Sequence, residues 1–349
     1  MPHQKISLAS DNCAGVHPTV MQAILAANAG YAPSYGADAW TEEAHRLIQQ
    51  AFGRPCQVLI VPSGTGSNVL ALKLACRRFE AVLCTDIAHI NYQESGAAES
   101  IVGCKLLSMP HVQGKITCAA LQKKLTSERA FGKHSTAPRV LSLSQTTEVG
   151  TVYTLDELKA VWQLCQAENI LLHMDGSRLY NALAALKISF AEMLQIVPLD
   201  ILSLGGTKNG LMGAEALVIF NPLLQEGSDH MHKQALQLMS KMRFLSAQYI
   251  PLFKDDLWRK LALQANDKAQ QIALLIQELP QLRLSYPVES NQIFFTAPAA
   301  WIPLIQDKIS CIAWDKDKGE VRLIASWSTS EKDVEDVQAV LAGLATDYP

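Results

Sequence analysis

The sequence predicts an α/β fold, with a large domain built on a mostly parallel sheet and a smaller C-terminal α+β domain. Short apolar runs alternate with helical patterns through most of the chain, as in parallel strands joined by crossover helices. This alternation stops near residue 250, and the total of 349 residues exceeds what one hydrophobic core usually supports. We therefore expect the large domain over residues 1–250 and the small domain over residues 251–349.

Composition narrows the class of protein. Hydrophobic residues make up 49% of the chain and charged residues 18%, which is typical of a compact globular enzyme. A net charge of -3 gives no electrostatic reason to expect nucleic acid or an anionic membrane as a partner. The cysteines form no CxxC pair, and no segment approaches the roughly 20 apolar residues of a membrane span. We expect reduced cysteines and a cytoplasmic protein.

The first elements follow from helical spacing and from turn residues. A helix is predicted over residues 17–29. A second helix should begin at Thr41, a good N-cap residue, and end at Gly53. We then expect a strand over residues 58–61 and the start of the next helix near Val69.

Later elements are predicted on the same grounds. In the large domain, strands should cover residues 81–86, 170–176 and 201–204, and a helix should cover residues 155–168 behind the capping box of Thr154 and Glu157. In the small domain, strands are predicted near residues 282–286, 291–295, 311–314 and 321–327, the last two as a hairpin, before a final helix over about 331–343.

Four residues that can carry chemistry come directly after predicted strands. They are Gly64, His89, Asp175 and Lys208. In parallel sheets, ligands bind at the carboxyl ends of the strands. We therefore expect these residues to border one site.

Lys208 stands in the run Gly205-Gly-Thr-Lys208-Asn-Gly210, after a short buried strand. Glycines let the backbone pass close to a ligand or adopt a positive φ. A lone amine among them indicates a Schiff-base lysine, which attacks an aldehyde once its environment lowers its pKa. The alternative is a solvated loop lysine.

The run Ser63-Gly64-Thr65-Gly66-Ser67 lies between a strand and a helix, where free backbone amides and hydroxyls bind phosphate. One alternative is a tight turn without a ligand. Another is a dinucleotide site in which Asp86 is the ribose acid. That motif lacks its third glycine here, and it would leave Lys208 without a role.

Asp175 ends an apolar strand, where a carboxylate needs a cation such as a protonated pyridine nitrogen. Arg178, three residues later, could neutralise it instead. His173 shares a strand face with Asp175 and could join it in a metal site, but no third ligand has suitable spacing. We interpret His173 as a hydrogen-bonded core residue and expect no metal.

Two further residues complete the candidate site. His89 could stack on a planar ligand or be purely structural. Arg322 lies in an otherwise apolar strand and needs a carboxylate, either from a substrate or from an acidic residue of the chain. Together these residues supply what pyridoxal 5'-phosphate and an amino acid require: a phosphate-binding turn, an acid for the ring nitrogen, an aromatic ring that stacks, a lysine that captures the aldehyde and an arginine that binds the carboxylate.

Over nearly its whole length the chain resembles the low-specificity L-threonine aldolases, a family of fold type I pyridoxal-phosphate enzymes. The stretches that carry the resemblance are Ser10-Asp-Asn12, Tyr35-Gly36, Ser63-Gly-Thr65, His89 with Glu94, Asp175-Gly-Ser-Arg178-Leu-Tyr-Asn181-Ala, Gly205-Gly-Thr-Lys208-Asn-Gly, and Arg322 with Ser326-Trp327.

The resemblance implies a role for each residue of the site. Toward the cofactor, Lys208 would form the Schiff base, Asp175 would face the ring nitrogen, His89 would stack on the ring, Arg178 would lie near the phenolic oxygen, and Ser63, Gly64 and Thr65 would bind the phosphate. Toward the substrate, Ser10 and Arg322 would bind the carboxylate. Tyr35 would come from a neighbouring subunit of a homodimer or homotetramer, and His134 falls where the family often keeps a second active-site histidine.

The reaction that the resemblance implies is retro-aldol cleavage of L-threonine, L-allo-threonine or a related β-hydroxy-α-amino acid to glycine and an aldehyde. The base that takes the β-hydroxyl proton is left open among His89, His134 and a bound water. The run Gln145-Thr-Thr-Glu148 departs from the commoner family pattern, so a preference for phenylserine stays open. The alternatives are an aminotransferase or β-eliminating lyase of the same fold, and a nucleotide-binding protein without catalysis.

Overall fold

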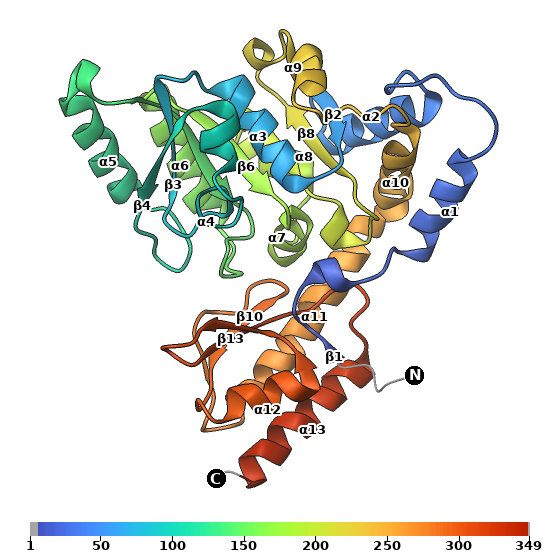
Figure 1. Ribbon diagram of the computed structural model, residues 1–349, viewed down its shortest axis with the longest axis vertical. Coiled ribbons are helices and arrows are strands. Elements are labelled where there is room, and N and C mark those ends of the chain that lie inside the picture. The colour runs from blue at the N-terminus through green and yellow to red at the C-terminus, as the bar shows by residue number, and fades with distance from the viewer. Residues whose placement is uncertain (1–5, 348–349) are drawn as a thin grey trace.

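The computed structural model describes residues 6–347, and its largest element is a seven-stranded sheet (Figure 1). In sheet order the strands are β2 (Gln57–Val61), β8 (Glu215–Ile219), β7 (Ile201–Leu204), β6 (Leu171–Gly176), β5 (Ala137–Ser144), β3 (Glu80–Thr85) and β4 (Lys105–Met109). All neighbours run parallel except where β8 pairs with β2 and β7. The predicted α/β fold with a mostly parallel sheet is confirmed.

Helices cover both faces of this sheet. Successive residues of β2 enter different cores, because Val58 and Ile60 join one apolar cluster while Leu59 and Val61 join the other. The helices of this part of the chain are α1 (Pro18–Ala27), α2 (Ala39–Phe52), α3 (Gly64–Ala75), α4 (His89–Tyr92), α5 (Cys118–Ala130), α6 (Leu155–Ala167), α7 (Leu179–Leu186), α8 (Phe190–Ile196), α9 (Ser228–Gln234) and α10 (Arg243–Phe253).

Two predicted helix starts are wrong. The N-cap of α2 is Asp38, whose carboxylate accepts hydrogen bonds from both the amide and the hydroxyl of Thr41, each at 2.9 Å. Helix α3 begins at Gly64 and not near Val69, because the Ser63 hydroxyl caps it by accepting from the Gly66 amide at 3.1 Å. The glycine-rich run is therefore the first turn of a helix.

The C-terminal part forms a second sheet, antiparallel, with strands in the order β12 (Ile312–Asp315), β13 (Glu320–Ile324), β10 (Gln292–Thr296) and β9 (Arg283–Leu284). The predicted hairpin is confirmed, since β12 and β13 pair in antiparallel fashion. Helices α11 (Leu257–Gln277), α12 (Trp301–Lys308) and α13 (Glu331–Asp347) pack with this sheet around an apolar cluster of their own.

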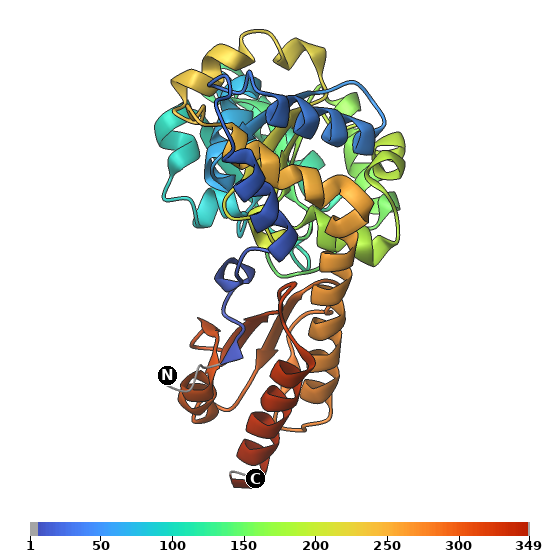
Figure 2. The ribbon, with the colours of Figure 1, turned by 90° about the vertical axis from the view of Figure 1, so that its right-hand side faces the viewer.

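Two segments connect the two sheets (Figure 2). The short strand β1 (Ile6–Ser7) pairs in parallel with β11 (Ile309–Ser310), so the chain enters the large unit from the side of the small one. Helix α11 runs between both units, because its first turns contribute to the core of the large unit and its last turns to the core of the small unit. The division of the chain at residue 250 stays a prediction.

None of the helices in the described part of the chain combines the length and apolarity that crossing a membrane demands.

Candidate active site

A cavity of about 730 Å³ lies at the carboxyl edge of the large sheet and reaches the small unit, within the usual size of ligand sites. A smaller cavity of about 290 Å³ shares His89, Ser177 and Lys208 with it. The predicted site residues that line one or both cavities are Ser10, Ser63, Gly64, Thr65, His89, Asp175, Arg178, Lys208 and Arg322. Residues from both ends of the chain thus border one space.

Lys208 lies in the short helical turn Thr207–Asn209, just after β7. Its amine has no hydrogen bond or ion pair with any residue between 6 and 347. Burial lowers its pKa, and the nearby charge of Arg178 lowers it further, against the opposing effect of Asp11 and Asp175. An unpaired lysine of lowered pKa at a cavity wall is chemically able to act as a nucleophilic amine.

The glycines before Lys208 serve the backbone packing. A Cβ atom on Gly205 would lie 2.4 Å from the carbonyl oxygen of Ser177, and one on Gly206 would lie 2.3 Å from that of Ala214. These distances are far below van der Waals contact, so neither position accepts a side chain. The expectation that the glycines leave room for a ligand is therefore corrected, since the neighbours that they accommodate are protein backbone.

Asp175, at the end of β6, has no cation at hydrogen-bond distance. Its carboxylate accepts from the Asn68 amide and from the Ser177 backbone, each at 2.9 Å. Burial alone would raise the pKa of Asp175, but the charges of His89 and Lys208 and these hydrogen bonds outweigh it and hold the pKa below its ordinary value. The carboxylate is thus kept ionised beside the cavity.

Arg178 does not neutralise Asp175, so that alternative is wrong. Its guanidinium binds Asp11 with two hydrogen bonds of 2.7 and 2.9 Å. Asp11 is buried and also accepts from Asn291 at 3.0 Å. This bidentate pair fixes the N-terminal segment against the helix that follows β6.

A hydrogen-bonded chain sets the position of the His89 ring. The ring Nδ1 lies 2.7 Å from Oε1 of Glu94, and the same oxygen accepts from Asn68 at 2.8 Å. Because Asn68 also donates to Asp175, His89 and Asp175 belong to one buried network. Nothing in the sequence indicated a role for Asn68. Only the occurrence of Glu94 five residues after His89 in the family pattern pointed to this hydrogen-bond network.

The start of α3 provides free backbone donors. The amides of Gly64 and Thr65 precede the first intrahelical hydrogen bond, which runs from Ser67 to Ser63. A Cβ atom on Gly64 would meet only the Ser177 hydroxyl, at 3.9 Å, so the space above this turn is open. These amides line the smaller cavity together with Lys208 and can bind an anion.

Arg322 extends from β13 into the larger cavity without a carboxylate partner among the described residues. Its Nη2 donates to the Ala9 carbonyl at 3.3 Å, its Nε is buried without a partner, and its guanidinium carbon lies 4.7 Å from the centre of the Trp314 ring. Burial and the nearby charge of Arg178 lower its pKa to about 10. An arginine left this way is suited to a carboxylate from outside the chain.

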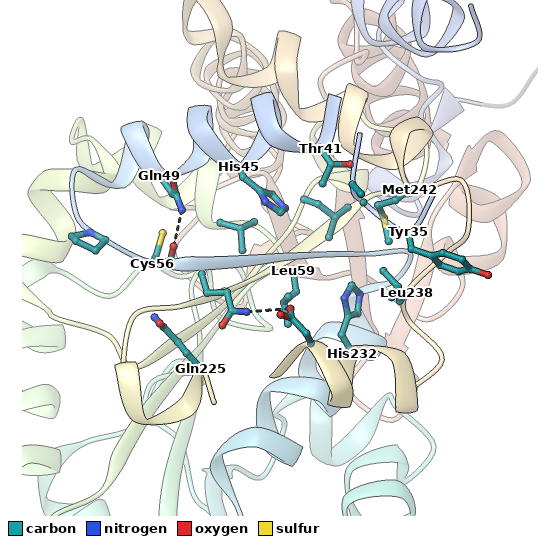
Figure 3. Close-up of a pocket in the computed structure, with 17 residues that line it drawn as sticks. Tyr35, Thr41, His45, Gln49, Cys56, Leu59, Gln225, His232, Leu238 and Met242 are labelled. Carbon is teal, nitrogen blue, oxygen red and sulfur yellow. Dashed lines mark hydrogen bonds between the residues drawn. The ribbon is translucent and has the colours of Figure 1, made fainter. Parts of the chain in front are cut away.

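Two predicted site residues lie outside these cavities. His134 is exposed in a short turn before the amino end of β5, whereas the carboxyl end of that strand, at Ser144, reaches the cavity. Tyr35 borders a different cavity, of about 760 Å³, and Figure 3 shows its ring pointing away from His45 and His232. The Tyr35 side chain is half exposed, with the Lys233 amine 4.1 Å from the ring centre. Within one chain, neither residue joins the site.

His173 has both ring nitrogens occupied. Nδ1 lies 2.8 Å from the Ser142 hydroxyl and Nε2 lies 3.1 Å from the Ser203 hydroxyl, and the residue is fully buried. The interpretation of His173 as a hydrogen-bonded core residue is confirmed. Burial lowers its pKa to about 4.

The low pKa of His173 predicts a pH-dependent stability. In the unfolded chain this histidine is protonated below its ordinary pKa of about 6.5, whereas in the folded chain it stays neutral until the pH approaches about 4. The free energy of unfolding therefore falls as the pH drops from about 6.5 to about 4. We expect the free energy of unfolding to be lower at pH 5 than at pH 7 by roughly 1–2 kcal/mol from this group alone. In urea unfolding, His173→Gln should show a correspondingly smaller pH 5 to pH 7 difference, and an unchanged difference would contradict this assignment.

Comparison with known proteins agrees with this geometry. A family model described as Beta-eliminating lyase matches residues 7–300. The low specificity L-threonine aldolase of Pseudomonas sp. (strain NCIMB 10558) is 37% identical over 97% of this chain and 98% of its own length. That of Pseudomonas aeruginosa is 38% identical over 95% and 94%. A solved structure of Leishmania major threonine aldolase superposes with a TM-score of 0.92 at 32% identity, covering 97% of this chain and 99% of the other.

Proposed function

The chain belongs to the Beta-eliminating lyase family and, within it, to the low-specificity L-threonine aldolases, and we propose that it cleaves β-hydroxy-α-amino acids with pyridoxal 5'-phosphate as cofactor. The substrates are L-threonine, L-allo-threonine or a close relative, and the products are glycine and an aldehyde. The enzyme is therefore a carbon–carbon lyase.

One observation carries the proposal. The unpaired amine of Lys208 and the guanidinium of Arg322, which has no carboxylate partner among the described residues, line the same cavity, although Lys208 follows a strand of the large sheet and Arg322 lies in the small one. The first can capture the cofactor aldehyde, and the second can bind the carboxylate of an amino acid. A nucleotide-binding protein would need neither.

The residues present fit the cofactor. Gly64 and Thr65 offer free amides to its phosphate beside the Ser63 hydroxyl, and the Asp175 carboxylate, held ionised without a cation, suits the ring nitrogen. His89 would stack on the ring, and Arg178 would lie near the phenolic oxygen. When bound, the cofactor supplies an electron sink for the carbon that loses its bond.

The protein side chains would orient the substrate for cleavage. Arg322, with Ser10 beside it in the cavity, binds the carboxylate and fixes how the amino acid is turned about its Cα. Asp175 would keep a proton on the ring nitrogen of the bound cofactor. The site then needs one group that takes a proton from the β-hydroxyl. His134 does not line the cavity of its own chain, so we propose that another residue is that group.

A side-by-side assay tests the function. Purified protein loaded with pyridoxal phosphate should release glycine and acetaldehyde from L-threonine and L-allo-threonine, and benzaldehyde from phenylserine if the larger side chain is accepted. Serine serves as the substrate with the smallest side chain. Pyruvate and ammonia would instead indicate β-elimination, a pyridoxamine spectrum would indicate transamination, and no turnover of any substrate would reject the proposal.

We further propose a cytoplasmic homodimer or homotetramer. No disulfide joins the cysteines, which all lie in the described part of the chain, and most of them are buried, as in a reducing compartment. The exposed Tyr35, at the rim of its own cavity, is placed where it can be offered to a neighbouring subunit. Light scattering on the assayed sample should show an oligomer, and a fully active monomer would contradict this part of the proposal.

A further inference from the structure

Glu148, in the loop after β5, is a partly buried acidic residue that lines the larger cavity and is held mainly through one carboxylate oxygen. Its Oε1 accepts from the Ser144 hydroxyl at 2.6 Å and from the backbone amide of His89 at 3.1 Å. Apart from a contact with the backbone amide of Glu148 itself, no further donor among residues 6–347 binds this carboxyl group, and Glu148 lines the same cavity as Lys208 and Arg322. The contacts at Oε1 fix the carboxyl group, and no other side chain in the described part of the chain donates to Oε2.

The surroundings of Glu148 favour a group that gains and loses a proton. Burial raises its pKa, and the negative charge of Asp175 raises it further, more than the hydrogen bonds from Ser144 and His89 lower it. A carboxyl whose pKa moves toward neutral pH is a better acid and base there than an ordinary glutamate.

The neighbouring candidates are placed for other tasks. The His89 ring is bound through Nδ1 to Glu94, and its face is the one proposed to stack on the cofactor ring, while the His89 backbone amide donates to Glu148. Asp175 receives two hydrogen bonds, one on each oxygen. Glu148 is not fixed in this way on its second oxygen.

We propose that Glu148 is the catalytic acid and base at the β-hydroxyl group of the substrate. This inference rests on the proposed aldol cleavage and deepens it by naming the residue that moves the proton. The run that contains it, Gln145-Thr-Thr-Glu148, departs from the commoner family pattern.

The step balances among the substrate, Glu148 and solvent. Oε2 of Glu148 takes the hydroxyl proton, and the electron pair of the O–H bond becomes the second bond of the aldehyde carbonyl. The bond between Cα and Cβ breaks, and its electron pair stays with Cα of the glycine fragment. Cα then takes up a proton that comes from solvent, and Glu148 returns its own proton to solvent, so no proton is gained or lost overall. In the reverse direction, the protonated Glu148 delivers the same proton to the new hydroxyl oxygen.

The test uses Glu148→Gln in the cofactor-loaded enzyme. Glutamine keeps an oxygen that can accept from Ser144 and the His89 amide, but it cannot exchange a proton. Cleavage of L-threonine should fall about 10²- to 10⁴-fold in kcat, as the loss of a general acid or base does. Glycine has no β-hydroxyl, so exchange of its α-proton in D₂O, followed by NMR, and its dissociation constant, read from the absorbance change, should stay within about twofold of wild type.

The matched control is Glu289→Gln. Glu289 is an exposed glutamate outside the cavity, and it accepts a 2.6 Å hydrogen bond from the amide of Val152, four residues after Glu148. It should leave both reactions unchanged. The proposal is overturned if Glu148→Gln cleaves threonine at nearly the wild-type rate, or if glycine exchange falls in parallel with cleavage, which marks a merely structural role. A wild-type enzyme that exchanges glycine protons but cleaves no β-hydroxy amino acid would reject the proposed function itself.

Discussion

Replacing Lys208 with alanine is expected to reduce kcat for threonine cleavage on the order of 10⁴-fold or more, in line with the removal of a nucleophilic residue from other active sites. The amine is the unpaired basic group beside both cavities, and burial together with Arg178 lowers its pKa toward the reactive, uncharged form. The visible absorbance of the loaded enzyme should disappear with the amine. Borohydride reduction followed by peptide mapping should label Lys208 in wild type and no lysine in the variant.

Lys208→Arg separates the positive charge of this side chain from its ability to add to an aldehyde. Arginine keeps the positive charge near Asp175 but cannot add to an aldehyde, so activity and absorbance should be lost as in the alanine variant. Since Lys208 makes no hydrogen bond or ion pair with the described residues, the unfolding midpoint of the cofactor-free alanine variant should stay within about 2 °C of wild type. Borohydride labelling of another lysine in either variant would reject Lys208 as the cofactor lysine.

The fold was predictable to the extent that it depends on local patterns. Strand β6 and the capping box of α6 follow from apolar runs and from residue types at fixed spacing, and both are present. The start of α3 was misplaced because glycine usually ends a helix, whereas here the Ser63 cap allows Gly64 to begin one. Strands β4 and β8 were not predicted, and the antiparallel direction of β8 depends on pairing partners far away in the sequence.

The candidate site was predictable where it depends on the ends of parallel strands. Asp175 and Lys208 follow neighbouring strands, so topology alone brings them to one edge. The pairing of Arg178 with Asp11 joins residues 167 positions apart, and no local pattern indicates it. The sequence likewise marked Glu148 only as a departure from a family pattern. Its position at the cavity depends on contacts with Ser144 and with the backbone of His89, which the sequence does not indicate.

Asp175→Asn is expected to lower kcat by roughly 10²- to 10³-fold, the usual cost of removing one charge aligned with charge that develops in a transition state. The carboxylate is ionised, since the charges of His89 and Lys208 and the hydrogen bonds from Asn68 and Ser177 hold its pKa down against burial. An asparagine cannot keep a proton on the ring nitrogen, so the electron sink is weakened. Glycine α-proton exchange should fall together with threonine cleavage, in contrast to Glu148→Gln.

Asp200→Asn is a closely matched control for this change. Asp200 precedes β7 at the opposite end of the sheet, and it too accepts from one backbone amide and one asparagine, Leu172 at 2.8 Å and Asn221 at 2.7 Å. Asp200→Asn removes the same negative charge and likewise replaces one accepting oxygen with a donating NH₂ group, but it does so at the end of the sheet opposite the cavity. If both variants lost activity equally, the effect would come from disturbed packing at strand ends. A loss confined to Asp175→Asn, with both proteins unfolding at similar temperature, would place the charge itself in the reaction.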